Sequence, residues 1–435
     1  MTPGARLQAT IVLLDAVLSS DAPADRVVTQ YFRQCRYMGS TDRRVISESV
    51  YQILRRYEEV AWYLQGVPYH RQDWARLLAL AYTHKVQRVS PDQIQTLCQG
   101  GSFTPTPLSP VEQMLLKEIG RLEPGAMPLP VRLNIPAWSL PHLEATFGNE
   151  MEAAVSALNQ PAPLDLRVNT LKTTRDRVLE QLNTEGFEAT PTPWSPVGIR
   201  LKERRPLSGH ELWKKGEIEV QDEGSQLLAL LVNARPGMAV IDYCAGAGGK
   251  TLALAATMEN RGRIVATDLA EWRLERSRER LRRAGIHNVE FRSLNDEATI
   301  KWLKRQAARF DRVLVDAPCS GSGTWRRNPD LKRRFLEKDL SELITKQQLI
   351  LRRAASLVKP GGRLIYATCS LFKGENDNQI TAFLNAHPNF HLIPVKEIWS
   401  SIFKTPFPGK EGTLQLTPHT HQVDGFFMAV MGLKA

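Results

Sequence analysis

Short apolar strands alternate with helical stretches from Glu223 onward, and this alternation restricts the possible fold more than any other feature of the sequence. The predicted strands are seven runs rich in aliphatic and aromatic residues: AVIDYCA, RIVATDLA, VEFRSL, RVLVDAP, RLIYATCS, FHLIPV and GFFMAVM. The predicted helices between and before them cover 223–234, 250–258, 272–283, 343–358 and 376–386. Alternation at this spacing predicts an α/β fold with a doubly wound, mostly parallel seven-stranded sheet. Ligands of such sheets bind at the carboxyl ends of the strands.

The chain before residue 223 contains a helical region, a proline-dense linker and a segment of short strands. Apolar residues recur every three or four positions from Thr2 to about Ser102, which predicts an all-α region. A proline-dense stretch from Phe103 to Pro141 reads as a linker with short helices, and 164–220 alternates short strands with a helix at 175–184. We therefore predict a helical domain with its linker at 1–140, a small α+β module at 141–222 and an α/β domain at 223–435. The strands of the small module are basic, and such sheet faces often hold single-stranded RNA: Arg167, Lys172, Arg200, Lys202, Arg204 and Arg205.

Charge and cysteine content indicate the kind of partner and the cellular compartment. The chain has 57 Lys and Arg against 46 Asp and Glu, a net charge of +11 that favours a polyanionic partner such as nucleic acid. Its five cysteines, at 35, 98, 244, 319 and 369, include no CxxC pair, so neither a disulfide framework nor a zinc ribbon is indicated. No apolar run reaches the ~18 residues of a membrane span. We expect a protein of the reducing cytoplasm, with no membrane association.

A glycine-rich turn, DYCAGAGGKT from Asp242 to Thr251, joins the first strand of the α/β region to a helix. Glycines at such a junction let a ligand approach the backbone and the N-terminus of the helix. A phosphate-binding loop would need a glycine where Cys244 stands, and a dinucleotide-binding turn would need one at Thr251. Both alternatives therefore miss a required residue.

S-adenosylmethionine also binds against a glycine-rich first turn, with an acid at the end of the second strand on its ribose hydroxyls. Asp268 ends RIVATD and is the candidate for this role, with capping of the next helix as its other function. Asp296, just beyond the third strand, is a candidate contact on the adenine side, with helix capping as the alternative. We expect S-adenosylmethionine as the cofactor.

Two cysteines follow neighbouring strands. Asp316 and Cys319 end the strand RVLVDAP, and Cys369 ends RLIYATCS. Taken alone, Asp316 could cap a turn and Cys319 could be a small core residue. The doubly wound sheet, however, brings both thiols to one side of the predicted cofactor cleft.

Thiols at this place suit methylation of a pyrimidine at C5. A soft nucleophile adds to C6, which makes C5 an enamine-like carbon able to take an electrophilic methyl group. Loss of the C5 proton and of the thiol then restores the ring. Asp316 would hold the N3 and N4 edge of a cytosine, and Lys250 or Arg326 would lower the pKa of a thiol.

At these residues the chain resembles the RNA cytosine-5 methyltransferases of the NOL/NOP/Sun family. The resemblance extends from about Leu164 to the C-terminal end through DYCAGAGGKT, DAPCSGSGTWRRNPD, KPGG, YATCSLFKGENDNQI and DGFF. The helical region resembles the NusB-like domain that precedes this catalytic unit in bacterial members acting on small-subunit ribosomal RNA, through RLQATIVLLDAVL and TDRRVISESVYQILRR. RVNTLK and QDEGSQ resemble the RNA-binding module of the family and its entry helix. The glycine turn departs at Ala247, where the family commonly has proline.

The resemblance implies a role for each site residue. Cys369 would be the nucleophile, Cys319 would assist release of the methylated RNA, and Asp316 would contact the cytosine, with Lys250 beside them. Matches to the cofactor-contacting positions of the family are Cys244, Ala245, Gly246, Ala247, Gly248, Gly249, Lys250, Asp268, Asp296 and Asp316.

We therefore predict an S-adenosylmethionine-dependent RNA cytosine-C5 methyltransferase that acts on 16S ribosomal RNA as a monomer, without a metal. Three alternatives stay open: the same reaction on transfer RNA, a catalytically silent RNA-binding assembly factor on this fold, and a nucleotide-hydrolysing or nicotinamide-using enzyme. The paired cysteines disfavour the silent factor, and the mismatched glycine turn disfavours the last alternative.

Overall fold

The computed structural model describes residues 1–66, 73–409 and 412–434. The chain forms two compact units. The first contains Met1–Gln160 and a second segment, Trp325–Leu336; the other contains Pro161–Thr324 and Glu337–Ala435. The predicted division at residues 140 and 222 remains a prediction. Across the described ranges, no helix is both long and apolar enough to cross a membrane.

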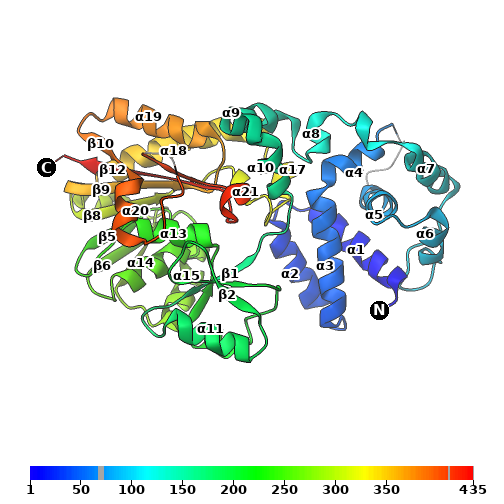
Figure 1. Cartoon of the computed structure of the whole chain (residues 1–435), viewed down its shortest axis with the longest axis horizontal. Coiled ribbons are helices and arrows are strands. Elements are labelled where there is room, and N and C mark those ends of the chain that lie inside the picture. Colours follow the sequence, from blue (N-terminus) through cyan, green and yellow to red (C-terminus); the bar gives the residue numbers. More distant parts are fainter. Residues whose placement is uncertain (67–72, 410–411, 435) are drawn as a thin grey trace. The chain divides into compact units, whose positions relative to one another are not determined.

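The first unit is helical, as predicted from its three- and four-residue spacing. Thr2 caps the first helix, and Ser90 and Ser109 form capping boxes ahead of Pro91 and Pro110, so side chains and prolines mark where these helices begin. Its core is aliphatic, with Leu, Ile and Val side chains from successive helices. The helices are α1 Pro3–Leu18, α2 Ala24–Gln34, α3 Ser40–Arg55, α4 Tyr57–Tyr63, α5 Trp74–Lys85, α6 Pro91–Leu97, α7 Pro110–Arg121, α8 Leu129–Arg132, α9 Leu140–Phe147, α10 Met151–Leu158 and α17 Leu331–Arg334 (Figure 1).

The helix α17 belongs to the first unit although it follows the Cys319 motif in the sequence. Side chains of its segment bond to backbone groups of the N-terminal helices. Asp330 Oδ2 accepts a hydrogen bond from Ala24 N at 3.2 Å, and Arg333 donates to Leu18 O at 3.1 Å. These long-range bonds explain why a short piece of the sequence between two strands of the α/β sheet is part of the helical unit.

A small antiparallel sheet opens the second unit, with the strand order β2-β3-β1-β4. Leu166, Ile199 and Ile218 from its strands pack with Val178 and Leu182 of α11. The predicted α+β character of this module is confirmed, and the helix at 175–184 is observed with the predicted bounds. The elements are β1 Leu164–Val168, α11 Arg175–Thr184, β2 Ala189–Pro191, β3 Gly198–Leu201, α12 Glu211–Lys214 and β4 Ile218–Val220.

The main sheet has the strand order β10-β12-β9-β8-β5-β6-β7, and β11 adds to β12 off this path. Neighbours from β7 to β9 are parallel, whereas β12 is antiparallel to both β9 and β10. The predicted doubly wound, mostly parallel sheet is confirmed. Its elements are α13 Glu223–Leu231, β5 Ala239–Asp242, α14 Gly249–Thr257, β6 Arg263–Asp268, α15 Glu271–Ala284, β7 Val289–Ser293, α16 Glu297–Arg305, β8 Phe310–Asp316, α18 Glu337–Ala355, β9 Val358–Thr368, α19 Asp377–Ala386, β10 Phe390–Ile393, α20 Val395–Ile402, β11 Leu414–Leu416, α21 Pro418–His421 and β12 Phe426–Leu433.

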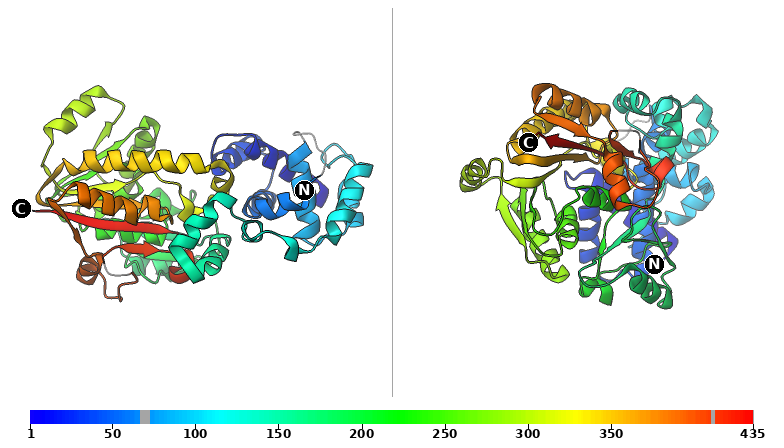
Figure 2. Two further views of the ribbon diagram at one scale, coloured as in Figure 1. Left: turned by 90° about the horizontal axis from the view of Figure 1, so that it is seen from above. Right: turned by 60° about the vertical axis from the view of Figure 1, so that its left-hand side comes forward.

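Helices cover both faces of this sheet. Val240 of β5 and Leu314 of β8 pack against α13, α14, α15 and α20, whereas the next residues, Ile241 and Val315, pack against α16, α18 and α19. Successive strand residues point to opposite faces, so the strands are apolar on both sides. Figure 2 shows α18 and α19 beside each other along the sheet.

One predicted boundary was wrong. The sequence predicted a helix at 343–358 and a turn at KPGG, but α18 spans Glu337–Ala355 and β9 already begins at Val358. Val358 pairs with Phe310, and the register shifts between Phe310 and Arg312. Pairing with β8 therefore draws the KPGG segment into the strand.

Candidate active site at the carboxyl ends of the strands

Four neighbouring strands end in a polar side chain or lead directly into one. Asp242 ends β5, Asp268 ends β6, Asp316 ends β8 and Cys369 follows β9. Because these strands are parallel, their carboxyl ends lie at one edge of the sheet. The fold therefore gathers the residues that the sequence placed at strand ends.

The glycine turn after β5 requires left-handed backbone at two positions. Gly246 has φ +55° and Gly248 has φ +77°. A Cβ on Gly248 would lie 2.0 Å from Ser277 Oγ, whereas a Cβ on Gly246 would meet open space. The turn thus packs closely on α15 at Gly248 and leaves room for a ligand at Gly246.

The other turn residues form its frame. Ala245 N donates to Thr267 O at 2.8 Å, and Ala247 O accepts from Arg280 at 2.5 Å. Cys244 is half-buried, and burial, with the charge of Asp242 adding to it, raises the pKa of its thiol well above the ordinary value. Cys244 is therefore an uncharged thiol that lines the turn.

Asp268 is bound to the turn through both carboxylate oxygens. Its Oδ2 accepts from Gly246 N and its Oδ1 accepts from Ala270 N, each at 2.8 Å. The carboxylate therefore fixes the turn at Gly246 and the residue before α15, but it does not cap that helix, because Ala270 is the N-cap and no side chain bonds there, so the capping alternative was wrong. It lies beside the open space at Gly246, where the predicted ribose contact would be made.

Asp296 makes capping contacts. Its Oδ1 accepts from Ala298 N at 2.9 Å and its Oδ2 from Thr299 Oγ1 at 3.3 Å, at the start of α16. These contacts realise the capping alternative, and the adenine-side contact remains a prediction.

Asp242 is a site residue that the sequence reasoning missed. Its Oδ2 accepts from Thr251 Oγ1 at 2.7 Å, but its buried Oδ1 has no hydrogen-bond partner. Burial, together with the negative charges of Asp316 and Asp268, raises the pKa of Asp242 to about 7. An acid that ends a core strand was the signal used for Asp316, and the same signal would have identified Asp242.

The unpaired Asp242 oxygen and the open space at Gly246 fit a cofactor that carries an amino group. An ammonium group would supply the partner that Asp242 Oδ1 lacks, and the left-handed Gly246 lets the cofactor approach the backbone. S-adenosylmethionine has both an amino group and a cationic sulfur. The residues present therefore fit this cofactor.

Three basic residues predicted to face RNA have other partners. Arg167 is buried and donates to Gly249 O at 2.7 Å and to Gln221 at 2.5 Å; burial lowers its pKa to about 10. Lys172 donates to backbone carbonyls, of which Lys215 O is at 2.6 Å. Arg200 pairs with Asp165. The prediction of an RNA-facing role was wrong for Arg167, because β1 presents it to the glycine turn at Gly249.

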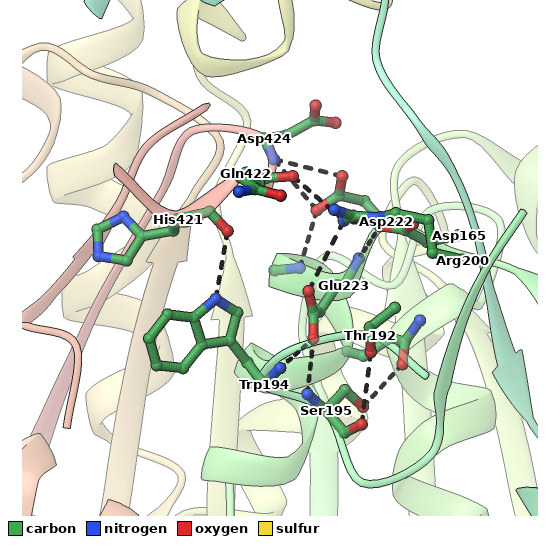
Figure 3. A network of polar contacts seen from close by, with 12 residues as sticks. Asp165, Thr192, Trp194, Ser195, Arg200, Asp222, Glu223, His421, Gln422 and Asp424 are labelled. Atoms are coloured by element: carbon green, nitrogen blue, oxygen red, sulfur yellow. Dashed lines mark hydrogen bonds and ion pairs between the residues drawn. The ribbon is translucent and has the colours of Figure 1, made fainter. Parts of the chain in front are cut away.

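Arg200 belongs to a polar network at the junction of the small module and the main sheet (Figure 3). Its Nε donates to Asp165 Oδ1 at 2.7 Å, and its Nη2 lies 3.7 Å from Glu223 Oε2. Asp222 accepts from Asp424 N at 3.3 Å. Burial raises the pKa of Glu223. The network joins β1, β3 and the start of α13 to the DGFF segment, so the QDEGSQ and DGFF motifs meet here.

Lys250 and Asp316 form an ion pair at the centre of the site. Lys250 Nζ lies 2.6 Å from Asp316 Oδ2, and the side chain of Asp316 is 32% exposed, so it stays accessible to a ligand. Burial alone would lower the pKa of Lys250, but the Asp316 carboxylate outweighs it and the pKa is raised. The Cys369 sulfur also acts on the Lys250 pKa in this direction, so the ammonium group and a Cys369 thiolate attract each other.

The two cysteine sulfurs are in contact. Cys319 Sγ lies 3.4 Å from Cys369 Sγ. The hydrogen bond to Cys369 and then burial raise the pKa of Cys319 well above its ordinary value. The expectation that a cation lowers the pKa was therefore wrong for Cys319. Arg326 belongs to the helical unit, and its predicted influence on a thiol remains a prediction.

Comparison with known proteins identifies family models for two stretches of the chain, the longer of them in the main sheet. A family model described as 16S rRNA methyltransferase RsmB/F matches residues 229–432, and one for the ferredoxin-like domain of RsmF/B-like methyltransferases matches residues 135–208. Probable ribosomal RNA small subunit methyltransferase B of Synechocystis sp. is 35% identical over 68% of this chain and 66% of its own length. The protein of the same description from Bacillus subtilis is 31% identical over 77% of this chain and 74% of its own length.

Solved structures agree with these matches. The crystal structure of PH0851 has a TM-score of 0.79 with 28% identity and covers 99% of both chains. A methyltransferase homologue from Pyrococcus horikoshii has a TM-score of 0.60 with 29% identity, covering 72% of this chain and all of its own. The resemblance inferred from the motifs is confirmed.

Proposed function

The chain belongs to the 16S rRNA methyltransferase RsmB/F family, and from this premise we propose that it transfers a methyl group to C5 of a cytosine in 16S ribosomal RNA through a covalent cysteine adduct. Family membership implies RNA methylation that depends on S-adenosylmethionine. The choice of base, of atom and of mechanism is our proposal. The observation that carries it is the pair of sulfurs of Cys319 and Cys369, 3.4 Å apart beside the Lys250–Asp316 ion pair.

Cys369 is the nucleophile in this proposal. Its thiolate, attracted by the Lys250 ammonium group, adds to C6 of the cytosine, so that an S–C6 bond forms and electron density moves to C5 and N3. The Asp316 carboxylate accepts a hydrogen bond from the N4 amino group and so holds this edge of the cytosine, while the Lys250 ammonium group paired with it supplies the positive charge that stabilises the added electron density. S-adenosylmethionine supplies a methyl group on a cationic sulfur, which C5 accepts.

Release requires a base. After methyl transfer the C5 proton must leave, the S–C6 bond must break, and its electron pair must return to Cys369. We assign the proton to the Cys319 thiolate, because its sulfur lies 3.4 Å from the reacting sulfur of Cys369 in the free protein. Cys319 must first lose its own proton, so the rate of release should rise with pH into the alkaline range.

Substrate choice rests on the names of the relatives and on charge. The relatives are described as small-subunit ribosomal RNA methyltransferases, and the net charge of +11 suits a polyanion. The helical N-terminal region and the small module would position the RNA while the target base is unstacked into the cleft. Transfer RNA is the second candidate substrate.

The test uses the two cysteine variants with S-adenosylmethionine and either 16S ribosomal RNA or transfer RNA. Cys369→Ala should abolish methyl incorporation, whereas Cys319→Ala should accumulate a covalent RNA–protein adduct that survives denaturing electrophoresis. An active Cys369→Ala protein, or a Cys319→Ala protein without adduct, would contradict the mechanism. Methylation of transfer RNA alone would contradict the substrate, and no methylation by the wild type would favour a silent assembly factor.

A further inference from the structure

Glu375 is a fully buried carboxylate near the two cysteine loops, and the chemistry above does not use it. It lies in the short turn Lys373–Glu375 before α19 and is 0% exposed. A charged carboxylate is stable in such a place only when hydrogen bonds replace its hydration. The identity of its donors therefore indicates what it holds.

Four hydrogen bonds converge on the Glu375 carboxylate. Its Oε1 accepts from Ser320 N at 2.8 Å and from Gln347 Nε2 at 3.0 Å. Its Oε2 accepts from Ser320 Oγ at 2.6 Å and from Ser370 Oγ at 2.5 Å. An ionised carboxylate only accepts hydrogen bonds and has room for all four donors.

Two of these partners directly follow the cysteines in the sequence. Ser320 is next to Cys319, and Ser370 is next to Cys369. One side chain thus binds both cysteine loops, which lie at the ends of separate strands. The Ser320 and Ser370 hydroxyls are also 3.2 Å from each other.

Further bonds support the same arrangement. Gln347 of α18, which donates to Glu375, also donates to Pro318 O at 2.9 Å, on the other side of Cys319. Leu371 N donates to Ser322 Oγ at 2.9 Å, which links the two loops a second time. The Cys319 loop is therefore held on both sides, with Glu375 at the centre.

We propose that Glu375 is a positioning residue that fixes the distance between the Cys319 and Cys369 thiols by bridging the residue that follows each of them. The inference rests on the proposed two-cysteine chemistry. In that chemistry one sulfur is bonded to C6 while the other acts at C5 of the same ring, so their separation decides how fast release occurs. A misplacement of about 1 Å can cost about 100-fold in rate.

The experiment compares Glu375→Ala and Glu375→Gln with wild type, Cys319→Ala and a matched control. Gln379→Met is the control, because Gln379 is also buried and bonds to the same turn, at Gly374 O, and to Ile344 O, but not to the residue that follows either cysteine. Each protein is incubated with 16S ribosomal RNA and S-adenosylmethionine. The readouts are the turnover rate, the KM for RNA, the fraction of enzyme in covalent adduct, and binding of S-adenosylhomocysteine.

Glu375→Ala should lower turnover by about 10- to 100-fold with KM changed by no more than about twofold, and should raise the adduct fraction toward that of Cys319→Ala. Glu375→Gln keeps the shape, and its amide can satisfy some of the same partners, so it should lose only about tenfold or less. Gln379→Met should leave the adduct fraction at the wild-type level. Accumulation of adduct is the discriminating result, because a protein that is merely less stable loses activity without trapping RNA.

Other outcomes separate the two hypotheses. If Cys319→Ala traps RNA but neither Glu375 variant raises the adduct fraction, the positioning role is overturned and the two-cysteine mechanism stands. If Cys319→Ala traps nothing, the mechanism itself fails, and the inference fails with it. If both Glu375 variants lose S-adenosylhomocysteine binding or do not fold, Glu375 is structural and the proposed role is wrong.

Discussion

Two buried lysines, one in each unit, have similar burial and opposite electrostatics. Lys250 in the second unit is 8% exposed and Lys332 in the helical unit is 5% exposed. The pKa of Lys250 is raised above 10.5, whereas that of Lys332 is lowered to about 7. Burial opposes the charge in both cases, so the partners decide the direction.

The partners differ in charge. Lys250 Nζ faces the Asp316 carboxylate at 2.6 Å. Lys332 Nζ donates to Arg55 O at 3.2 Å, to Asn134 O at 3.0 Å and to the side-chain oxygen of Asn159. Carbonyl dipoles satisfy the hydrogen bonds of an ammonium group but do not neutralise it, and the Arg55 charge, which opposes it further, outweighs the favourable charge of Glu58. The comparison shows that a negative partner, more than a full set of hydrogen bonds, keeps a buried lysine charged.

Asp316→Asn should have the largest effect, because it gives Lys250 a neutral partner like those of Lys332. Methyl transfer should fall by about 100-fold or more, since the proposed contact of Asp316 to the cytosine edge changes as well. The pKa of Lys250 should fall below 10.5. Initial rates of methyl incorporation, and the pH dependence of Lys250 acylation followed by mass spectrometry, measure the two effects.

Asp311→Asn is the matched control for this change. Asp311 lies at the other end of β8 and pairs with Lys359, whose side chain is 44% exposed. Such a pair near the surface contributes about 1 kcal/mol or less, so methyl transfer should change by no more than about threefold. An Asp316→Asn protein as active as this control would show that the ion pair is not needed.

The helical unit should become more stable as pH rises from 7 to 9. With a folded pKa of about 7 and an ordinary value of 10.5, Lys332 holds a proton in the unfolded chain that it has lost in the folded one. The free energy of unfolding therefore rises with pH, by up to about 1.4 kcal/mol per unit. Urea unfolding at pH 7, 8 and 9 measures this slope, with cleavage by a protease within α3 and α4 as the readout of unfolding of the helical unit.

Other groups leave this pH window clear. Asp242, with a pKa raised from 3.8 to about 7, lowers stability as pH rises only between those values. Cys98, whose pKa is raised from 9.0 by burial, lowers stability only above pH 9. Lys250, raised above 10.5, contributes no slope between 7 and 9. Lys332→Met should flatten the slope, and a variant that keeps the wild-type slope would assign it to another group.

Phe426→Leu should have the smallest effect of the three changes. The Lys250 ammonium group lies 5.8 Å from the centroid of the Phe426 ring. Loss of this cation–π contact should cost about 0.5 to 1 kcal/mol, or about a two- to fivefold lower rate. Phe427→Leu, next in the strand but packed on the opposite face of the sheet, removes the same apolar volume and is the control. Equal rates for both variants would show that the contact between the Phe426 ring and Lys250 does not contribute to methyl transfer.

Much of the candidate site follows from local pattern. The period of apolar residues predicts the strands, and parallel strands bring their carboxyl ends together, so the sequence is enough to place Asp268, Asp316 and Cys369 at one edge of the sheet. Predicted boundaries were wrong where strand pairing overrides the local helical preference. Val358 was predicted to end a helix, but it pairs with Phe310 of β8 and begins β9.

Partners in space could not be predicted in the same way. Arg167 is a positively charged residue on a basic strand, as expected of an RNA-binding residue, yet it is buried and donates to Gly249 O. Glu375 looks like an ordinary acid of a polar stretch, yet it binds Ser320 across 55 residues of sequence. The sequence around each residue does not distinguish it from an exposed charged residue. Only the contacts made by distant parts of the chain show that it is buried.

The sequence alone therefore determined the order of strands and helices, the strand ends that carry polar groups and the family resemblance, because periodicity and motif spacing act over a few residues. The tertiary structure decided which of these groups meet: Lys250 with Asp316, Cys319 with Cys369, and the segment at 325–336 with the helical unit. The physical reason is that charge, burial and hydrogen bonding act through space. They depend on distances that folding sets and that spacing along the chain does not contain.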